Sequence, residues 1–211
     1  MTDLSEIIDA CKRDEELARK ILYEQTSTRM RAICFRYLGN KSDTEDVLHE
    51  SFIIVFTKIK QFEGKGSFEG WMKRIFINNS LRFLKDKRKA ELSHGDEMLS
   101  KWEYENADSP LSSKGKEKQE DLIRRMEFTK EELMEVLQTL PEGYRLVFNL
   151  FIFEKHGHKE IAKLLSISEN TSKSQLNRAR KYIQQKLYKI SIERAGKEEN
   201  DQYKQHLRVV V

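Results

Sequence analysis

The chain has 211 residues, of which 38% are hydrophobic and 35% are charged. Its 2 prolines and 9 glycines are too few for the turns that sandwiches, barrels and wound α/β folds require. This composition predicts an all-α fold of small helical units with long polar faces. No run approaches the roughly 18 apolar residues that span a bilayer, and the N-terminus lacks a signal pattern. We therefore expect no membrane insertion and a cytoplasmic location.

The net charge of +4 is unevenly distributed along the chain. Residues 1–90 carry a net charge of +4, residues 91–130 carry −3, residues 131–188 carry +2 and residues 189–211 carry +1. Two basic ends around an acidic middle suggest two contacts with a polyanion, joined by a segment that avoids it.

The N-terminal part of the chain has the spacing of amphipathic helices. Apolar residues recur at helical intervals from Leu4 onward, and Gly39 is a natural helix stop. Ser42 and Glu45 have the pattern of a capping box, which predicts the start of another helix. The acidic side chains in its first turn suit the positive end of the helix dipole.

The next segment passes from aromatic to basic residues. Ser67 should cap a helix, and seven basic groups lie between residues 73 and 89. Aromatic rings can stack on unpaired bases while cations follow the phosphate backbone, so this segment suits single-stranded nucleic acid. The same pattern also fits Phe68 and Trp71 as core residues. We expect the first domain to cover residues 1–90.

A second helical domain follows a break in the pattern. Over residues 91–128, Asp, Ser, Pro and Gly cluster without apolar periodicity, which indicates a flexible acidic linker. Thr129 and Glu132 form another capping box and begin a domain over residues 129–188. Residues 189–211 form a C-terminal tail, for which a fraying helix is the favoured interpretation.

The second domain ends in the pattern of a helix-turn-helix. A short helix over residues 159–165 is followed by a three-residue turn and a basic helix that Ser168 can cap. The face that docks this helix carries Ser172, Leu176, Ala179 and Ile183. Its other side carries the residues expected to contact DNA, which are Thr171, Lys173, Ser174, Gln175 and Arg178. Polar side chains on one stripe suit base edges in a major groove, and the cations suit phosphates.

The ordered set of motifs resembles one known family. The motifs are DTEDVLHESF (43–52), FEGKGSFEGW (62–71), LPEGYRLVFNLF (140–151) and HKEIAKLLSISENTSKSQLNRAR (158–180). In this order, with a basic helix after the second motif, they look like the extracytoplasmic-function sigma factors. These are small two-domain members of the sigma-70 family of bacterial RNA polymerase subunits. The resemblance covers about residues 5–90 and 130–188.

The resemblance implies a role for each domain. The first domain would be region 2, which binds the polymerase clamp and melts the promoter −10 element. The second would be region 4, which reads the −35 element. Carried over by position, the polymerase contact falls on Asp43, Glu45, Asp46, His49 and Glu50. The −10 contact falls on Phe68, Trp71, Asn78, Asn79, Arg82 and Lys85, and the −35 contact falls on the five residues of the helix-turn-helix named above.

The chain departs from the family pattern at three of these positions and at two others in the helix-turn-helix. His49 stands where glutamine is usual, and Lys85 stands where arginine is usual. Arg82 replaces an aspartate and so reverses a charge, which puts the orientation of nearby basic side chains in doubt. Ser166 replaces the turn glycine, which is tolerable if its backbone stays near the helical region. Ser172 replaces a valine, and we expect it to loosen the docking of the second helix.

Two other classes of function are weighed against a sigma factor. A stand-alone dimeric helix-turn-helix regulator would leave the acidic 43–50 turn and the aromatic-to-basic helix unexplained. An enzyme is disfavoured because the five histidines have no metal-site spacing and no phosphate loop or nucleophile motif occurs. We expect no cofactor and no metal. The expected partners of the monomeric chain are core RNA polymerase and promoter DNA, and the resemblance also favours an anti-sigma factor that no residue identifies.

Overall fold

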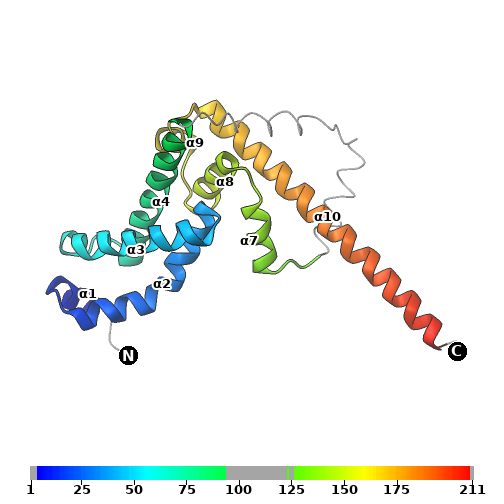
Figure 1. The fold of residues 1–211 in the computed structure, drawn as a ribbon, viewed down its shortest axis with the longest axis horizontal. Coiled ribbons are helices and arrows are strands. Elements are labelled where there is room, and N and C mark those ends of the chain that lie inside the picture. The colour runs from blue at the N-terminus through cyan, green and yellow to red at the C-terminus, as the bar shows by residue number, and fades with distance from the viewer. Residues whose placement is uncertain (1–3, 94–122, 124–125, 210–211) are drawn as a thin grey trace. The chain divides into compact units, whose positions relative to one another are not determined.

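The computed structural model describes residues 4–93, 123 and 126–209. The chain divides into two compact units, Met1–Glu97 and Met98–Val211. Every regular element within the described ranges is helical, which confirms the prediction of an all-α fold (Figure 1). Most of the predicted linker, 91–128, lies outside the described residues.

The first unit, hereafter the N-terminal unit, contains four α-helices and one short 3-10 helix within its described part. These are α1 (Leu4–Lys12), α2 (Glu16–Leu38), α3 (Lys41–Lys58), η1 (Ile59–Gln61) and α4 (Phe68–Ser93). Gly39 ends α2 as predicted, since it adopts a left-handed conformation and its N–H donates to the Phe35 carbonyl at 2.9 Å.

Helix α3 begins earlier than the sequence pattern predicted. Its N-cap is Asn40, whose side-chain oxygen accepts a hydrogen bond of 2.8 Å from the Asp43 N–H. The expected capping box at Ser42 is therefore wrong, because Ser42 already lies inside the helix. Asparagine is as good an N-cap as serine, and the acidic residues still fall in the first turns.

The core of the N-terminal unit lies between α2, α3 and α4. The largest fully buried side chains of the unit are Leu22, Met30, Tyr37, Leu48, Ile59, Met72 and Phe76. Cys11 and Cys34 are buried free thiols, as predicted. Burial raises the pKa of Cys34 to about 11, so this thiol is protonated at neutral pH.

The second unit, hereafter the C-terminal unit, contains a helix-turn-helix. Its elements are α7 (Lys130–Gln138), α8 (Glu142–Phe148), the π-helical turn η2 (Asn149–Phe153), α9 (His158–Leu165) and α10 (Glu169–Val209). The capping box at the start of α7 is confirmed. The Thr129 N–H donates to Glu132 Oε2 at 2.9 Å, and the Glu132 N–H donates to Thr129 Oγ1 at 3.2 Å.

A small apolar cluster docks α10 in the C-terminal unit. Leu137, Leu140 and Ala179 are buried, and four partly buried residues pack against them: Tyr144, Phe148, Tyr182 and Ile183. The docking face predicted for this helix is therefore confirmed at Ala179 and at Leu176, which is also buried.

Helix α10 continues as one helix beyond the expected domain boundary at residue 188 (Figure 1). Arg194 pairs with Glu132, donates to the Glu127 carbonyl at 2.9 Å, and lies over the Phe128 ring. Ser191 is fully buried one turn earlier. The packing of the C-terminal unit thus extends to at least Arg194.

Candidate polymerase and nucleic-acid interface

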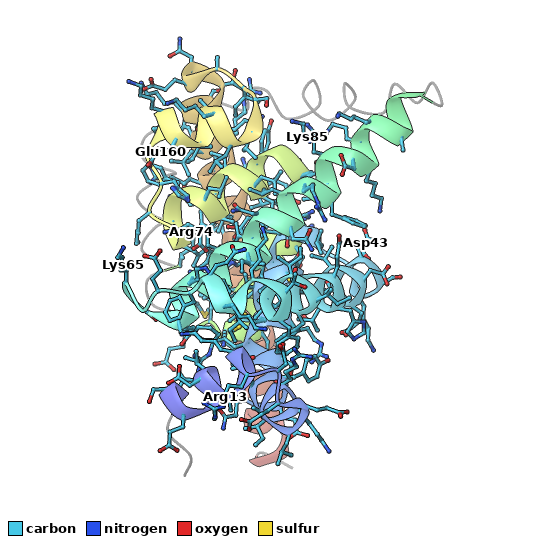
Figure 2. All side chains as sticks on the ribbon, turned by 90° about the vertical axis from the view of Figure 1, so that its left-hand side faces the viewer. Arg13, Asp43, Lys65, Arg74, Lys85 and Glu160 are labelled. Atoms are coloured by element: carbon cyan, nitrogen blue, oxygen red, sulfur yellow. The ribbon has the colours of Figure 1, made fainter. Side chains whose placement is uncertain are left out.

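Three of the five residues predicted to bind polymerase are engaged within the N-terminal unit. Asp43 accepts a hydrogen bond of 2.8 Å from Lys87 Nζ on α4. Glu45 accepts from Arg31 Nε on α2 at 2.6 Å, and this hydrogen bond lowers the pKa of Glu45. Glu50 pairs with a residue of α4, described below. Figure 2 shows Asp43 at the N-terminal end of α3.

The other two predicted polymerase residues lie open on α3. Asp46 and His49 are exposed, and among the described residues no hydrogen bond or ion pair occupies either side chain. One turn further along the same stripe, Ile53 is 66% exposed. An acidic, an imidazole and an apolar side chain at helical spacing form a surface suited to another protein.

A polar network joins α3 to α4 at the position of the charge reversal. Arg82 pairs with Glu50 and also donates to Asn79 Oδ1 at 2.8 Å. The Asn79 amide in turn donates to Ser51 Oγ at 3.0 Å and to Glu50 Oε2 at 3.3 Å. Asn79 is only 4% exposed, so the structure places this predicted DNA contact inside the unit. The network fixes the orientation of Arg82 itself.

The aromatic residues before α4 form a cluster. The ring centroids of Phe62, Phe68 and Trp71 lie 5.2–5.5 Å apart. Phe68 is 6% exposed, whereas Trp71 is half-buried. Between the two interpretations left open by the sequence, the core interpretation therefore fits Phe68. Trp71 keeps part of its ring accessible.

The exposed face of α4 carries the remaining predicted DNA contacts. Asn78, Arg82 and Lys85 are exposed and lie at successive helical turns, and Figure 2 shows Lys85 on this helix. Arg82 and its acidic partner Glu50 are both exposed, so the Arg82 guanidinium remains accessible to a phosphate. The arrangement supplies two cations and one amide on a rigid helix, which suits a nucleic-acid backbone with bases nearby.

The turn of the helix-turn-helix differs from expectation at Ser166. This residue has φ 57 and ψ 43, the left-handed conformation that glycine would adopt without strain, so the condition under which serine is easily tolerated here is not met. After the turn, Ser168 caps α10 as predicted, accepting from the Thr171 N–H at 2.9 Å. The Thr171 hydroxyl shares a further hydrogen bond with Ser168 Oγ at 2.7 Å.

Ser172 does not leave the second helix loosely docked. Its side chain is fully buried and shares a hydrogen bond of 2.9 Å with His158 Nδ1 on α9. The His158 ring also stacks on Phe151 at 4.8 Å. The expected loosening at Ser172 thus finds no support, because a polar link replaces the apolar contact that valine would make.

The predicted −35 contacts are not equivalent on α10. Lys173, Ser174 and Arg178 are exposed, and Lys173 pairs with Glu169 at 2.9 Å. Arg178 lies 3.4 Å from the hydroxyl of Tyr144 on α8. Gln175 is instead half-buried against Gly143, so its side chain faces α8. The exposed cations could have been found from the sequence, but the position of Gln175 depends on a contact between residues 32 apart.

Two searches of the described residues bear on other classes of function. No group of three or more His, Cys, Asp or Glu side chains there could hold a metal ion. In the same residues, no helix combines the length and apolar character needed to cross a membrane.

Comparisons with known proteins identify the family. Residues 22–90 match the family model for sigma-70 region 2, and residues 130–183 match that for sigma-70 region 4. The chain is 28% identical over 160 residues to the ECF RNA polymerase sigma factor SigW of Bacillus subtilis, covering 74% of this chain and 81% of that protein. It is 24% identical over 181 residues to the ECF sigma-E factor of Salmonella typhimurium, covering 86% and 92%.

Among solved structures, the chain is similar to the sigma factor RpoE in complex with the anti-sigma factor NepR from Bartonella quintana. The identity is 18%, the match covers 81% of this chain and 96% of that chain, and the TM-score is 0.46. The two matched regions together span more than half of the sequence in the order expected for a two-domain sigma factor. The chain therefore belongs to the extracytoplasmic-function subfamily of the sigma-70 factors, and is a non-enzymatic alternative sigma factor that directs RNA polymerase in transcription initiation.

Proposed function

We propose that the two units divide promoter recognition between them. Residues 1–90 bind core polymerase through α3 and hold the opened −10 strand through α4, while residues 129–188 read the −35 element through α10. Residues 91–128 link the two domains, and the complex works in the cytoplasm. The observation that carries this proposal is that each unit presents a docked helix with a group of exposed polar and cationic side chains. These are Asn78, Arg82 and Lys85 on α4 and Lys173, Ser174 and Arg178 on α10.

On α3, Asp46 and His49 are the proposed contact residues. They are exposed, and neither makes a hydrogen bond or an ion pair with the described side chains, whereas Asp43, Glu45 and Glu50 are held by cations of the same unit. We assign these three acids to holding α3 in position. Asp46→Ala with His49→Ala should weaken binding to core polymerase without changing the helical content. Glu24→Ala, an exposed acid on α2, is the matched control, and an equal loss in that variant would remove the assignment.

On α4, Asn78, Arg82 and Lys85 are the proposed −10 contacts. The cations follow the strand, and the accessible part of Trp71 offers a surface on which a base can stack. Phe68 and Asn79 act from within, by fixing the aromatic cluster and the orientation of Arg82. Lys85→Ala should therefore slow promoter opening more in low salt than in high salt, since added salt screens the contact that Lys85 makes with a phosphate.

On α10, Lys173 and Arg178 are proposed to contact phosphates and base edges, beside Thr171 and Ser174. Arginine pairs in a bidentate manner with guanine in the major groove. Arg178→Ala should lower transcription from promoters that depend on the −35 element by about tenfold or more. An equal loss on templates without that element would place its action elsewhere.

An anti-sigma factor is the proposed regulator. The stripe of Asp46, His49 and Ile53 offers charged and apolar groups to a protein partner, and covering it would deny α3 to polymerase. An anti-sigma factor that acts here should compete with core polymerase for the chain. Simultaneous binding of both proteins would exclude this site of regulation.

Transcription by the complete system tests the proposal. Purified core polymerase and fragmented genomic DNA from the source bacterium are incubated with and without the chain, and run-off transcripts are sequenced. New, discrete transcripts that need the chain are expected, and their upstream regions would give the promoter sequence. Tight binding to DNA without polymerase, with no new transcripts, would contradict the proposal.

A further inference from the structure

The side chain of Gln175 rests directly on the backbone of α8. A Cβ atom built on Gly143 would lie 3.0 Å from Gln175 Nε2 and 3.5 Å from its Cδ atom. The first of these distances is shorter than an ordinary contact between such atoms, so no larger residue fits at position 143 without moving the Gln175 amide. The contact joins the first turn of α8 to the predicted DNA-facing side of α10.

Glycine at position 143 is required for space rather than for backbone conformation. Gly143 does not belong to the residues with positive φ, so an alanine could adopt its backbone geometry. Glycine within a helix weakens it relative to alanine, because its unfolded state has more conformational freedom. The feature that glycine provides here is the absence of a side chain beneath Gln175.

In its position against Gly143, hereafter its seat, the Gln175 amide does not make all of its hydrogen bonds. Its Oε1 atom is buried and has no hydrogen-bond partner among the residues that the structure describes. A buried acceptor without a partner is unfavourable, so packing holds the amide in place and hydrogen bonding does not hold its oxygen. In a major groove, by contrast, a glutamine amide can pair with both N6 and N7 of an adenine.

We propose that Gly143 is a positioning residue for promoter recognition, because it lets Gln175 withdraw from the DNA-facing side of α10. Recognition of one A·T pair of the −35 element then requires Gln175 to leave this seat. Moving the amide out of its seat uses part of the free energy of binding to DNA. A methyl group at position 143 crowds the seat, because the Gln175 amide must then shift by a few tenths of an ångström, and so lowers that cost. The inference rests on the proposed reading of the −35 element by α10.

A double-mutant cycle with the full chain in holoenzyme tests this role. Gly143→Ala, Gln175→Ala and the double variant are assayed by run-off transcription on a promoter panel with every single base-pair change in the −35 element. Gln175→Ala should remove selectivity at one A·T pair, a loss of about fivefold or more. Gly143→Ala should raise selectivity at the same pair by about threefold, and should have no such effect when Gln175 is absent.

A control variant and the contrary outcomes distinguish the role of Gly143 from the proposed reading of the −35 element by α10. Gly157→Ala is a matched control in the same unit, because its Cβ would meet Glu160 Oε2 at an ordinary 3.8 Å. Additive effects in the cycle, or a Gln175→Ala loss that is equal on all promoters, would overturn the role of Gly143. If Arg178→Ala also lacks a −35-specific effect, the proposed function of α10 fails instead. Thermal unfolding of each variant verifies that the unit remains folded.

Discussion

The two units hold the helices that we propose to face DNA by different means. In the N-terminal unit, charged side chains of α3 and α4 pair across the helix interface, as Asp43 does with Lys87 and Glu50 with Arg82. In the C-terminal unit, small residues bring the start of α10 close to its neighbours, since Ser172 and Ala179 are fully buried and Gly143 lies beneath Gln175. An ion pair between Arg194 and Glu132 lies further along α10. A helix interface held by ion pairs should tolerate a change of side-chain volume better than a change of charge. A closely packed interface should be more sensitive to a change of volume.

The largest expected effect comes from adding volume beneath α10. Ala179→Leu places three more carbon atoms in the cluster with Leu137 and Leu140, where Ala179 is fully buried. Overpacking of this kind costs about 1–3 kcal/mol, which is a large share of the stability of a small unit. Hydrogen exchange resolved by peptide should show faster exchange in α7 and α10 and unchanged exchange in α2.

Asn177→Leu is the control for this variant. It adds a leucine to the same helix at an exposed position, where the stability should change by no more than about 0.5 kcal/mol. If Ala179→Leu leaves the hydrogen exchange of α7 unchanged, α10 does not pack closely against α7, and the proposed contrast between the two units is wrong.

The second prediction concerns the polar network of the N-terminal unit. Asn79→Ala removes the amide that bridges Ser51, Glu50 and Arg82, and leaves the buried Ser51 hydroxyl without that donor. This variant should lose about 1–2 kcal/mol in chemical unfolding. Glu50→Gln removes only an exposed ion pair and should lose less than about 1 kcal/mol.

The order of these two losses is the critical observation. If Glu50→Gln costs more than Asn79→Ala, then the exposed ion pair and not the buried amide holds α3 against α4. Arg82→Ala should also slow promoter opening less in either variant than in the parent. Without the network the guanidinium is not held in position, so it contributes less to the contact with DNA before it is removed.

Much of the fold could be predicted because its signals are local. Capping at Thr129, the helix stop at Gly39 and the helix-turn-helix each depend on residues within a few positions of one another. The start of α3 was misplaced by two residues because Asn40 and Ser42 are both good N-caps, and the sequence does not show which one is outside the helix.

The site was less predictable because burial depends on distant partners. A basic helix presents several faces, and whether Asn79 or Asn78 is exposed depends on where α3 packs. Likewise, the seat of Gln175 depends on Gly143 in another helix. Ser166 shows a different limit, since a residue that disfavours the left-handed region occupies it when the turn between two docked helices requires it.

The third prediction uses the strain at Ser166. Ser166→Gly should raise the stability of the C-terminal unit by about 0.5–1 kcal/mol, because glycine adopts φ 57 without the clash of a Cβ atom. Ser166→Ala keeps the Cβ atom and should bring no gain, which makes it the control. Equal stability of the glycine and alanine variants, measured by thermal unfolding, would show that the turn is unstrained.

The smallest expected effect tests the paired charges through pH. The hydrogen bond from Arg31 lowers the pKa of Glu45 below its ordinary 4.5, so the ionised carboxylate favours the folded state. This contribution is present above pH 4.5 and is lost as the pH falls through the lowered pKa, because Glu45 is then protonated in both states.

Arg31→Ala should therefore have a lower unfolding temperature than the parent at pH 7, and the difference should shrink toward pH 3. Added salt should shrink it as well, since both side chains are partly exposed. When Glu45→Gln is present in both chains, the difference in unfolding temperature caused by Arg31→Ala should no longer depend on pH, because glutamine does not titrate. A difference between Arg31→Ala and the parent that is the same at pH 7 and pH 3 would mean that Arg31 stabilises α2 by packing, and that charge pairing is not what distinguishes this unit from its neighbour.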